Sequence, residues 1–370
     1  MRILYVTTIS LTINSFFKSH IEMLIKEGNH VDIACNYNDL PIDKLFVELG
    51  CDFYQIDFSR SPLSTDNIKA FKQLKTLVET GKYDIVHCHT PNASVITRLV
   101  CKKFRKQTGL KVFYTAHGFH FYKGAPILNW IIYYPIEKFC SRYTDKLITI
   151  NKEDYNRAKN KFKAKEVYYV PGVGIDLSKF NDIQVDRDNK RRELGVPENA
   201  FLLLSVGELN ENKNHQVIIR AIAKLNNPNV HYVIAGVGDK RDSLVELASE
   251  LGVQSQLHLL GYRKDVLEIY HSADVFCFPS IREGLSVSLM EAMACGLPCV
   301  VSNIRGNIDL IDENGGKVFE FFDDNECSSA LKSILESSCS ELGRYNIQKI
   351  KNFSSAFVLE KMRSLYFRNV

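Results

Sequence analysis

Short apolar runs alternate with segments of helical periodicity along nearly the whole chain. Such runs predict parallel strands buried on both faces, and the segments between them, such as 16–26, 67–79 and 215–225, predict helices. The predicted strands are residues 3–7, 31–34, 85–88, 112–115, 146–150, 167–170, 202–206, 231–235, 257–259, 275–278, 299–301 and 316–318. This alternation restricts the chain to an α/β fold whose sheets are covered by helices.

A break in the alternation divides these strands into two series of six. Pro171 and Gly172 precede a polar, charged stretch, 176–192, which is typical of a linker. A chain of 370 residues also exceeds what one hydrophobic core usually serves. We therefore predict two doubly wound, Rossmann-like domains, residues 1–172 and 173–351. A C-terminal helix at about 352–370 is expected to pack back on the first domain.

Charge is distributed unevenly between the two halves. Residues 1–172 contain 25 Lys and Arg against 16 Asp and Glu, a net charge of +9, whereas the remainder contains 22 against 27, a net charge of −5. A basic first half suggests an anionic partner, such as a lipid surface, a phosphate-bearing acceptor or nucleic acid. A nucleic-acid binder would need a concentrated basic stripe with reading motifs, and the sequence has neither, so we expect no nucleic-acid partner.

The ten cysteines predict neither disulfides nor a metal site. They are scattered through apolar stretches without CxxC spacing, as expected of buried thiols in a reducing compartment. His87, Cys88 and His89 alternate between the faces of a predicted strand, and no further ligand cluster accompanies them. The first strand is too short for a signal peptide, and no apolar run approaches the ~18 residues of a membrane span. We expect a cytoplasmic protein, with peripheral attachment to the inner face of the cell membrane as an option.

The most informative motif is the segment 279–292, which follows a predicted strand and leads into a helix. The amide groups at that helix start suit an anionic phosphate, and Gly284 allows the backbone to approach a ligand closely. Glu291 lies further along the helix, where a carboxylate can accept hydrogen bonds from ribose hydroxyls, and Glu283 lies at the mouth of the site. Two glutamates on a solvated helix are the alternative interpretation.

Two further strand ends carry candidate side chains. Gly207 ends a buried strand, and Lys213 stands just before the next helix, where a point charge suits a diphosphate. His117, followed by Gly118, ends a strand of the first half and can point toward a reacting oxygen. A solvated lysine and a structural histidine are the alternatives.

In their order and spacing these motifs resemble the retaining family-4 glycosyltransferases of the GT-B fold, over nearly the whole chain. Glu283 and Glu291 match the family's E-x7-E pair, and residues 84–89, 117–118, 235–238 and 261–266 match its other landmarks. The Phe-His-Phe-Tyr run after Gly118 is similar to that of transferases for exopolysaccharide and capsule. GT-B implies two Rossmann-like domains whose parallel sheets face across a cleft.

The resemblance implies a catalytic group of His117, Lys213 and Glu283. It implies a donor-binding set of Gly207, Lys213, Tyr262, Arg263, Glu283, Gly284, Leu285, Ser286 and Glu291. It further implies a nucleotide sugar, most simply a UDP-sugar, as substrate, no cofactor and no essential metal. Anomeric configuration would be retained, by a front-face reaction in which the leaving phosphate takes the acceptor proton.

Two positions depart from the family pattern. Glu208 stands where most members carry an arginine beside the loop lysine, which removes one cation from the diphosphate unless Arg263 or Arg282 replaces it. The usual Gly-Gly turn after the first strand is replaced by residues 10–15, where a helix start capped by Asn14 or Ser15 would still receive a phosphate.

The first half also suggests contact with a membrane. Lys102, Lys103, Arg105 and Lys106 precede a segment rich in aromatic residues that includes Trp130. Cations beside amphipathic aromatic rings suit an anionic lipid surface, and an acceptor carried on a polyprenyl diphosphate would require such docking. The alternative is that the aromatic residues pack in the core.

Three other functions remain to be distinguished from a transferase. The sequence does not support a dehydrogenase, because the first strand-to-helix turn has no glycine-rich fingerprint for a dinucleotide. A nucleotide-sugar epimerase shares the fold, and a non-catalytic nucleotide-sugar-binding scaffold is suggested by Glu208. The identity of the sugar, the base and the acceptor, and the oligomeric state, do not follow from the sequence.

Overall fold

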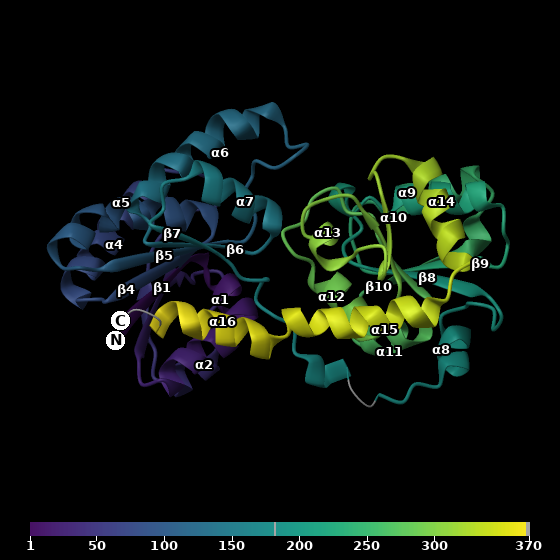
Figure 1. The fold of residues 1–370 in the computed structure, drawn as a ribbon, viewed down its shortest axis with the longest axis horizontal. Coiled ribbons are helices and arrows are strands. Elements are labelled where there is room, and N and C mark those ends of the chain that lie inside the picture. The colour runs from purple at the N-terminus through teal and green to yellow at the C-terminus, as the bar shows by residue number, and fades with distance from the viewer. Residues whose placement is uncertain (181–182, 368–370) are drawn as a thin grey trace. The chain divides into compact units, whose positions relative to one another are not determined.

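A computed structural model describes residues 1–180 and 183–367. The chain forms two compact units, each a parallel sheet with helices on both faces (Figure 1). Unit 1 comprises Met1–Gly174 together with the C-terminal helix, and unit 2 comprises Ile175–Ser354. The predicted α/β class with two Rossmann-like domains is therefore confirmed.

The strands of the two sheets are all short. They are β1 (Arg2–Ile9), β2 (His30–Asn36), β3 (Asp52–Gln55), β4 (Ile85–His89), β5 (Lys111–Ala116), β6 (Lys146–Thr149), β7 (Glu166–Tyr169), β8 (Phe201–Val206), β9 (Val230–Ala235), β10 (Leu257–Gly261), β11 (Val275–Phe278), β12 (Cys299–Ser302) and β13 (Gly316–Phe319). Each of the twelve predicted strands corresponds to one of these, and β3 is the strand that the sequence pattern missed.

Helices connect the strands in both units. They are α1 (Ser10–Phe16), α2 (Lys18–Lys26), α3 (Lys44–Glu48), α4 (Asp66–Gly81), α5 (Pro91–Gln107), α6 (Ile127–Cys140), α7 (Lys152–Lys161), α8 (Arg187–Glu193), α9 (Gln216–Leu225), α10 (Arg241–Glu250), α11 (Val266–Ser272), α12 (Val287–Ala294), α13 (Asn307–Leu310), α14 (Asp324–Leu335), α15 (Cys339–Ile350) and α16 (Ser355–Phe367). Short 3₁₀ turns are η1 (Ser141–Tyr143), η2 (Leu177–Phe180), η3 (Glu211–Lys213), η4 (Gln254–Gln256) and η5 (Lys351–Phe353). Within the described ranges, no helix combines the length and the apolar character that crossing a membrane requires.

The strand orders place a reversal of direction in each sheet. Unit 1 has the order β3-β2-β1-β4-β5-β6-β7, and unit 2 has the order β10-β9-β8-β11-β12-β13. The chain therefore winds outward in both directions from the pairs β1/β4 and β8/β11. Open α/β sheets bind ligands beyond the carboxyl ends of the strands at such a reversal, so each unit has one preferred place for a site.

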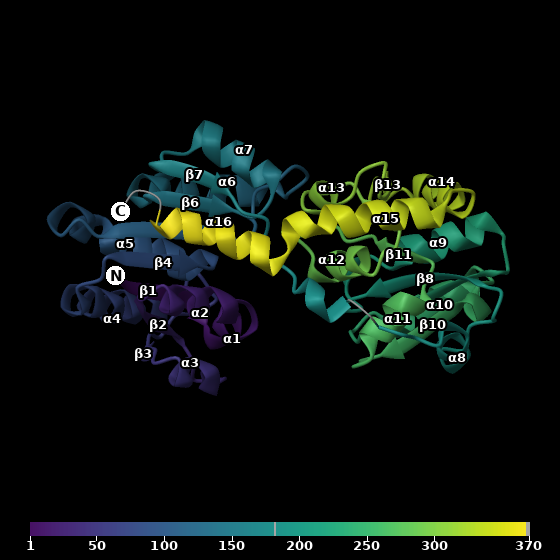
Figure 2. The ribbon, with the colours of Figure 1, turned by 60° about the horizontal axis from the view of Figure 1, so that its bottom comes forward.

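Helix α16 completes unit 1 although it follows unit 2 in the chain (Figure 2). It packs against α2, and its buried residues Val358, Met362, Leu365 and Tyr366 join the core beneath β1 and β2. The Lys146 ammonium donates a 2.6 Å hydrogen bond to the Leu365 carbonyl. Residues 368–370 of the predicted terminal helix lie outside the described residues.

The turn after β1 differs from the expectation. Helix α1 already begins at Ser10, with Ile9 at the N-cap and no side-chain cap, so Asn14 and Ser15 lie inside the helix. The Asn14 amide instead donates to the Pro41 carbonyl and accepts from the Asp43 backbone N–H. The predicted capping of a helix start by these two residues is wrong, because their side chains are committed to the chain around residues 41–43 or to the helix surface.

Candidate active site

The loops that follow β8 and β11 lie side by side at the reversal point of the unit 2 sheet, because these two strands are neighbours. The Ile281 N–H donates a 2.8 Å hydrogen bond to the Asn212 carbonyl, and the Asn212 amide donates to the Arg282 carbonyl at 3.1 Å. Asn214, which adopts a left-handed backbone, donates to the Pro279 carbonyl at 3.3 Å. Two motifs about 70 residues apart in the sequence thus form one surface.

The loop after β8 passes so close to the loop after β9 that only glycine fits at position 236. A Cβ at Gly236 would lie 1.8 Å from the Gly207 carbonyl oxygen, which is closer than atoms can approach. The loop after β8 is closed by Asn210, whose side chain accepts a 3.0 Å hydrogen bond from the Lys213 N–H and starts η3. These contacts fix the backbone of Lys213 at the carboxyl end of the sheet.

Lys213 and Glu283 form an ion pair across the two loops. The Lys213 Nζ to Glu283 Oε1 distance is 2.7 Å, and the two side chains are 19% and 18% exposed. The ammonium also lies 4.8 Å from the centre of the Phe278 ring. This largely buried pair, held in one geometry, gives the site a cation and a carboxylate with part of their surface still open to a ligand.

The turn after β11 is supported from behind by a second glycine. Gly306 has a φ of +82°, and a Cβ there would lie 2.3 Å from the Gly284 carbonyl oxygen, so only glycine fits. Ser286 caps α12 by accepting a 3.3 Å hydrogen bond from the Leu289 N–H, and half-buried Leu285 packs against the unit 2 core. The backbone of this turn is therefore held close to the start of α12.

Glu291 lies on α12 and is partly buried. The Tyr270 hydroxyl donates to Glu291 Oε2 at 3.1 Å and to the Ser288 carbonyl at 3.0 Å, which ties α11 to α12. Burial raises the pKa of Glu291, and the hydrogen bond from Tyr270 and the charge of Lys179 offset part of that rise. A carboxylate in such surroundings gains from hydroxyl donors, because a partly buried charge needs hydrogen bonds.

We expect Glu291→Gln to weaken binding of the nucleoside diphosphate by about 1–3 kcal/mol, since a charged acceptor for hydroxyl donors is lost. Titration calorimetry measures this, and Glu313→Gln, an exposed glutamate of the same unit, is the matched control. Unchanged affinity in the Glu291 variant would assign that carboxylate to a structural role with Tyr270.

The remaining donor-side candidates are placed differently. Tyr262 is 74% exposed, so its ring is available to a ligand. Arg263 is held by Glu193 and Asp265, which raise the pKa of its guanidinium, so its charge is already balanced. Glu208 is exposed and accepts a 2.7 Å hydrogen bond from the Asn210 amide. Sequence reasoning did not identify Asn210, Tyr270 and Gly306, which act on the site through other residues.

In unit 1, His117 follows β5 and joins a group of buried histidines. His117 Nε2 and His89 Nδ1 are 3.2 Å apart, and the Phe17 ring lies against His89 with ring centres 4.2 Å apart. Burial lowers the pKa of His117 to about 4, so the ring is neutral at pH 7. Burial and the neighbouring histidines also hold the pKa of His89 and His87 well below the ordinary value. His117 therefore serves as a hydrogen-bonding group rather than a cation.

A polar hollow of about 660 Å³ lies at the carboxyl ends of β1, β2 and β3 in the same unit. Its walls include Asn36, Asn38, Arg60, and the ion pair of Lys69 with Asp57 at 2.6 Å. Side chains that both donate and accept hydrogen bonds suit a ligand with many hydroxyl groups.

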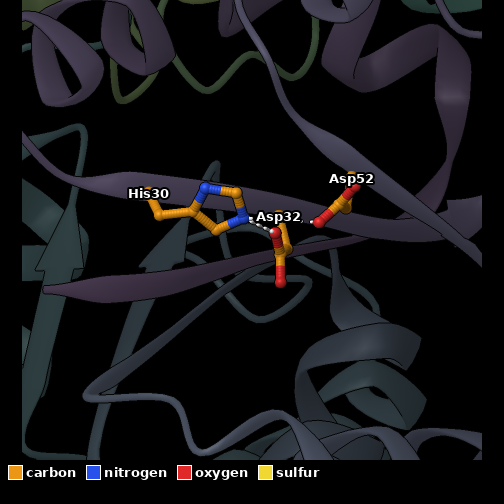
Figure 3. Close-up of side chains that lie close together, drawn as sticks. All are labelled: His30, Asp32 and Asp52. Carbon is orange, nitrogen blue, oxygen red and sulfur yellow. Dashed lines mark ion pairs between the residues drawn. The ribbon is translucent and has the colours of Figure 1, made fainter.

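Among the described residues, one group of three side chains has the spacing of metal ligands: His30, Asp32 and Asp52 (Figure 3). It lies at the amino ends of β2 and β3, the opposite edge from the ligand-binding ends of the strands. Asp32 already accepts hydrogen bonds from Arg2 at 2.8 Å and Tyr83 at 2.6 Å, and His30 lies 2.8 Å from its other oxygen. This network ties the first three strands together, and the Arg2 guanidinium balances the buried carboxylate of Asp32.

Comparison with known proteins shows which family the chain belongs to. Residues 2–151 match the family model for glycosyl transferase 4-like proteins, and residues 186–352 match the model for glycosyl transferases group 1. The chain is 34% identical to EpsD of Bacillus subtilis (strain 168), whose name assigns it provisionally as a glycosyltransferase, over 99% of this chain and 96% of that protein. It is 29% identical to the UDP-Gal:alpha-D-GlcNAc-diphosphoundecaprenol alpha-1,3-galactosyltransferase of Escherichia coli, over 93% and 90% of the two chains.

A solved structure shows the same fold at lower sequence identity. HepE of Anabaena, determined in complex with UDP and glucose, superposes with a TM-score of 0.76 at 15% identity and 99% coverage of both chains. The fold, the two family models and the full-length similarity to EpsD lead to one conclusion: the chain belongs to the family-4 glycosyltransferases of the GT-B fold.

Proposed function

We propose that the protein transfers a sugar, with retention of anomeric configuration, from a UDP-sugar to a lipid-linked saccharide in the synthesis of a cell-surface polysaccharide. The observation that carries this proposal is the ion pair of Lys213 with Glu283 at the reversal point of the unit 2 sheet, with Glu291 on the helix that follows the same turn. The hexosyl or N-acetylhexosaminyl class of the donor, and transfer without a metal, belong to the same proposal.

In this proposal unit 2 binds the donor. Lys213 neutralises the diphosphate, the amides of the Gly284–Ser286 turn bind its oxygens, and Glu291 accepts from the ribose hydroxyls. A bound diphosphate competes with Glu283 for Lys213, so donor binding frees Glu283 to meet a hydroxyl of the transferred sugar. The UDP in the HepE complexes supports uracil as the base.

Unit 1 binds the acceptor. The name of the Escherichia coli relative, which acts on a sugar joined to diphosphoundecaprenol, supports a lipid-linked acceptor. The polar hollow beyond β1, β2 and β3 offers hydrogen-bonding groups for its saccharide, and His117 contacts the transferred sugar as a neutral imidazole.

The chemical step follows from charge balance. The bond between the anomeric carbon and the diphosphate oxygen breaks, and the acceptor oxygen bonds to the same face of that carbon. The acceptor proton passes to the departing diphosphate oxygen. Lys213 and the backbone amides stabilise the charge that develops on the diphosphate, which is the largest single contribution that such a site makes.

A donor screen tests the proposal. The purified chain is incubated with a panel of UDP- and GDP-sugars and a lipid-linked saccharide, with and without EDTA. Released nucleoside diphosphate is measured, and the anomeric configuration of the product is determined by NMR. We expect release with one UDP-sugar that depends on the acceptor and is unaffected by EDTA. Interconversion of the nucleotide sugar without acceptor would favour an epimerase, and tight binding without turnover would favour a scaffold.

A further inference from the structure

We propose that the outer face of α6 inserts into the surface of a membrane that contains anionic lipid. The face consists of the residues that we call the α6 face: Ile127, Leu128, Ile131, Ile132, Ile136 and Phe139. The choice of a lipid surface as the occupant rests in part on the proposed function, because a lipid-linked acceptor lies at a membrane. The contacts that fix the rotation of α6, and so keep this face exposed, do not depend on the proposed function.

The α6 face is unusually apolar for an exposed helix. The six side chains are 79%, 60%, 65%, 43%, 41% and 46% exposed, in chain order. Ile127 and Leu128 recur four residues later as Ile131 and Ile132, and Ile136 and Phe139 continue the series, which places all six on one half of the helix. A contiguous apolar surface of this kind on a water-soluble unit marks an interaction site, whereas single exposed apolar residues do not.

The opposite side of α6 is locked, so the helix cannot rotate to bury this face. Glu137 and Arg98 form a buried ion pair at 2.8 Å, and the Tyr114 hydroxyl donates to Glu137 at 3.3 Å. Trp130 and Tyr134 pack against the unit 1 core on that side. A rotation that buried the isoleucines would leave Arg98 buried without its counter-ion, which costs more than the apolar contacts would return.

Cations border the α6 face. Arg142 lies 5.6 Å from the centre of the Phe139 ring, and Lys102 of α5 lies 5.0 Å from the centre of the Tyr143 ring just beyond the helix. Exposed Lys103 and Lys106 continue along α5, which packs against α6. A positive border repels a second copy of the same face but attracts anionic headgroups, so charge complementarity favours lipid as the occupant.

The structure also changes which of the residues predicted to contact a membrane are available to do so. Lys102, Lys103 and Lys106 are exposed, but Arg105 is half-buried in a bidentate pair with Asp145, with distances of 2.8 and 2.6 Å. Trp130 is half-buried against the core, and Arg157 lies over its ring at 4.7 Å. These two side chains are structural, and the isoleucines of α6, absent from the sequence-based set, take their place.

Vesicle sedimentation tests the inference with the full chain. Vesicles of phosphatidylcholine with and without phosphatidylglycerol are mixed with wild type and with the double variant Ile127→Ser, Ile131→Ser. We expect binding to the anionic vesicles that weakens as salt rises, and at least a ~10-fold weaker partition for the double variant, since two apolar side chains no longer insert. The matched control is Leu63→Ser, Ile68→Ser, which removes two exposed apolar residues elsewhere in unit 1 and should bind as wild type.

A charge series separates lipid from other partners. Lys102→Ser, Lys103→Ser, Lys106→Ser should lower partition by about fivefold for each lysine that approaches the lipid, whereas Lys72→Ser, Lys75→Ser on α4 should have little effect. No binding of wild type at low salt, equal losses in the test and control pairs, or a concentration-dependent dimer that Ile127→Ser, Ile131→Ser dissolves would each overturn the inference. Transfer to a short-chain, water-soluble acceptor should survive the double variant. Its absence in wild type would contradict the proposed function instead.

Discussion

Lys213→Ala is expected to lower turnover by about 10²–10³-fold, the loss typical of removing one preorganised charge from a site that stabilises a developing anion. The loss of stability should be smaller than the loss of turnover, although the two side chains are only 19% and 18% exposed and the variant leaves Glu283 without its partner. Steady-state kinetics with saturating donor, together with a thermal melt of the same preparation, separates the two effects. A melting temperature that falls in proportion to turnover would make Lys213 a structural residue.

Replacing Glu283, the other member of the ion pair, tests the same contact from its acidic side. Glu283→Gln frees Lys213 from its ion pair, so it should strengthen binding of the nucleoside diphosphate while slowing transfer, since Glu283 no longer meets the sugar. Lys213→Arg keeps the charge and should recover part of the lost turnover. Weaker nucleotide binding in Glu283→Gln would contradict the competition that we propose between the diphosphate and Glu283.

Acidification from pH 6.5 to pH 4 is expected to destabilise the protein by several kcal/mol, with unit 1 affected most. Burial lowers the pKa of His20 and His117 to about 4 and keeps the pKa of His87 and His89 lower still. In the unfolded chain the same imidazoles take up protons near pH 6.5. The contribution of these neutral histidines to the free energy of unfolding is therefore fully present above pH 6.5 and is lost as the pH falls toward 4. For His20 alone the loss is about 3 kcal/mol, at ~1.4 kcal/mol per pKa unit.

Denaturant unfolding at several pH values measures this slope. In unit 2 burial lowers the pKa of His215 to about 4 and also lowers the pKa of the less deeply buried His231, His258 and His271, so its transition should shift less than that of unit 1. His20→Gln removes one proton-binding group from the unfolded state and should flatten the pH dependence. An unfolding free energy that stays constant between pH 6.5 and 4.5 would refute the argument.

The central strands that the sequence revealed are buried on both faces. β8 and β11 are continuous apolar runs because helices cover both sides of the sheet, and such runs are visible without a structure. β3 is a four-residue strand at the edge of its sheet with partly exposed side chains, so its sequence carries no such signal. The other edge strands, β7, β10 and β13, were predicted, so an edge position alone does not hide a strand.

The candidate site was predictable in its residues but not in their pairing. The spacing of Glu283 and Glu291 identified both carboxylates, yet nothing in the sequence states that Lys213 meets Glu283 or that Arg263 is balanced by acidic neighbours. The same limit applied to α6. Its aromatic residues indicated an interface, whereas the fold turns Trp130, Tyr133 and Tyr134 toward the core and exposes Phe139 and the isoleucines, because a buried Arg98–Glu137 pair sets the rotation of the helix.

The position of α16 has a consequence for the order in which the protein is made. Unit 2 is inserted into unit 1 as 180 consecutive residues, and its two ends are neighbours, since the Ile175 N–H donates a 3.0 Å hydrogen bond to the Phe353 carbonyl. The first unit to leave the ribosome is thus the last to be completed. At 5–20 residues per second, synthesis of unit 2 takes roughly 10–40 s. During that interval the apolar surface that will receive Met362 and Tyr366 is uncovered, so the nascent N-terminal unit is the part of the chain most exposed to aggregation.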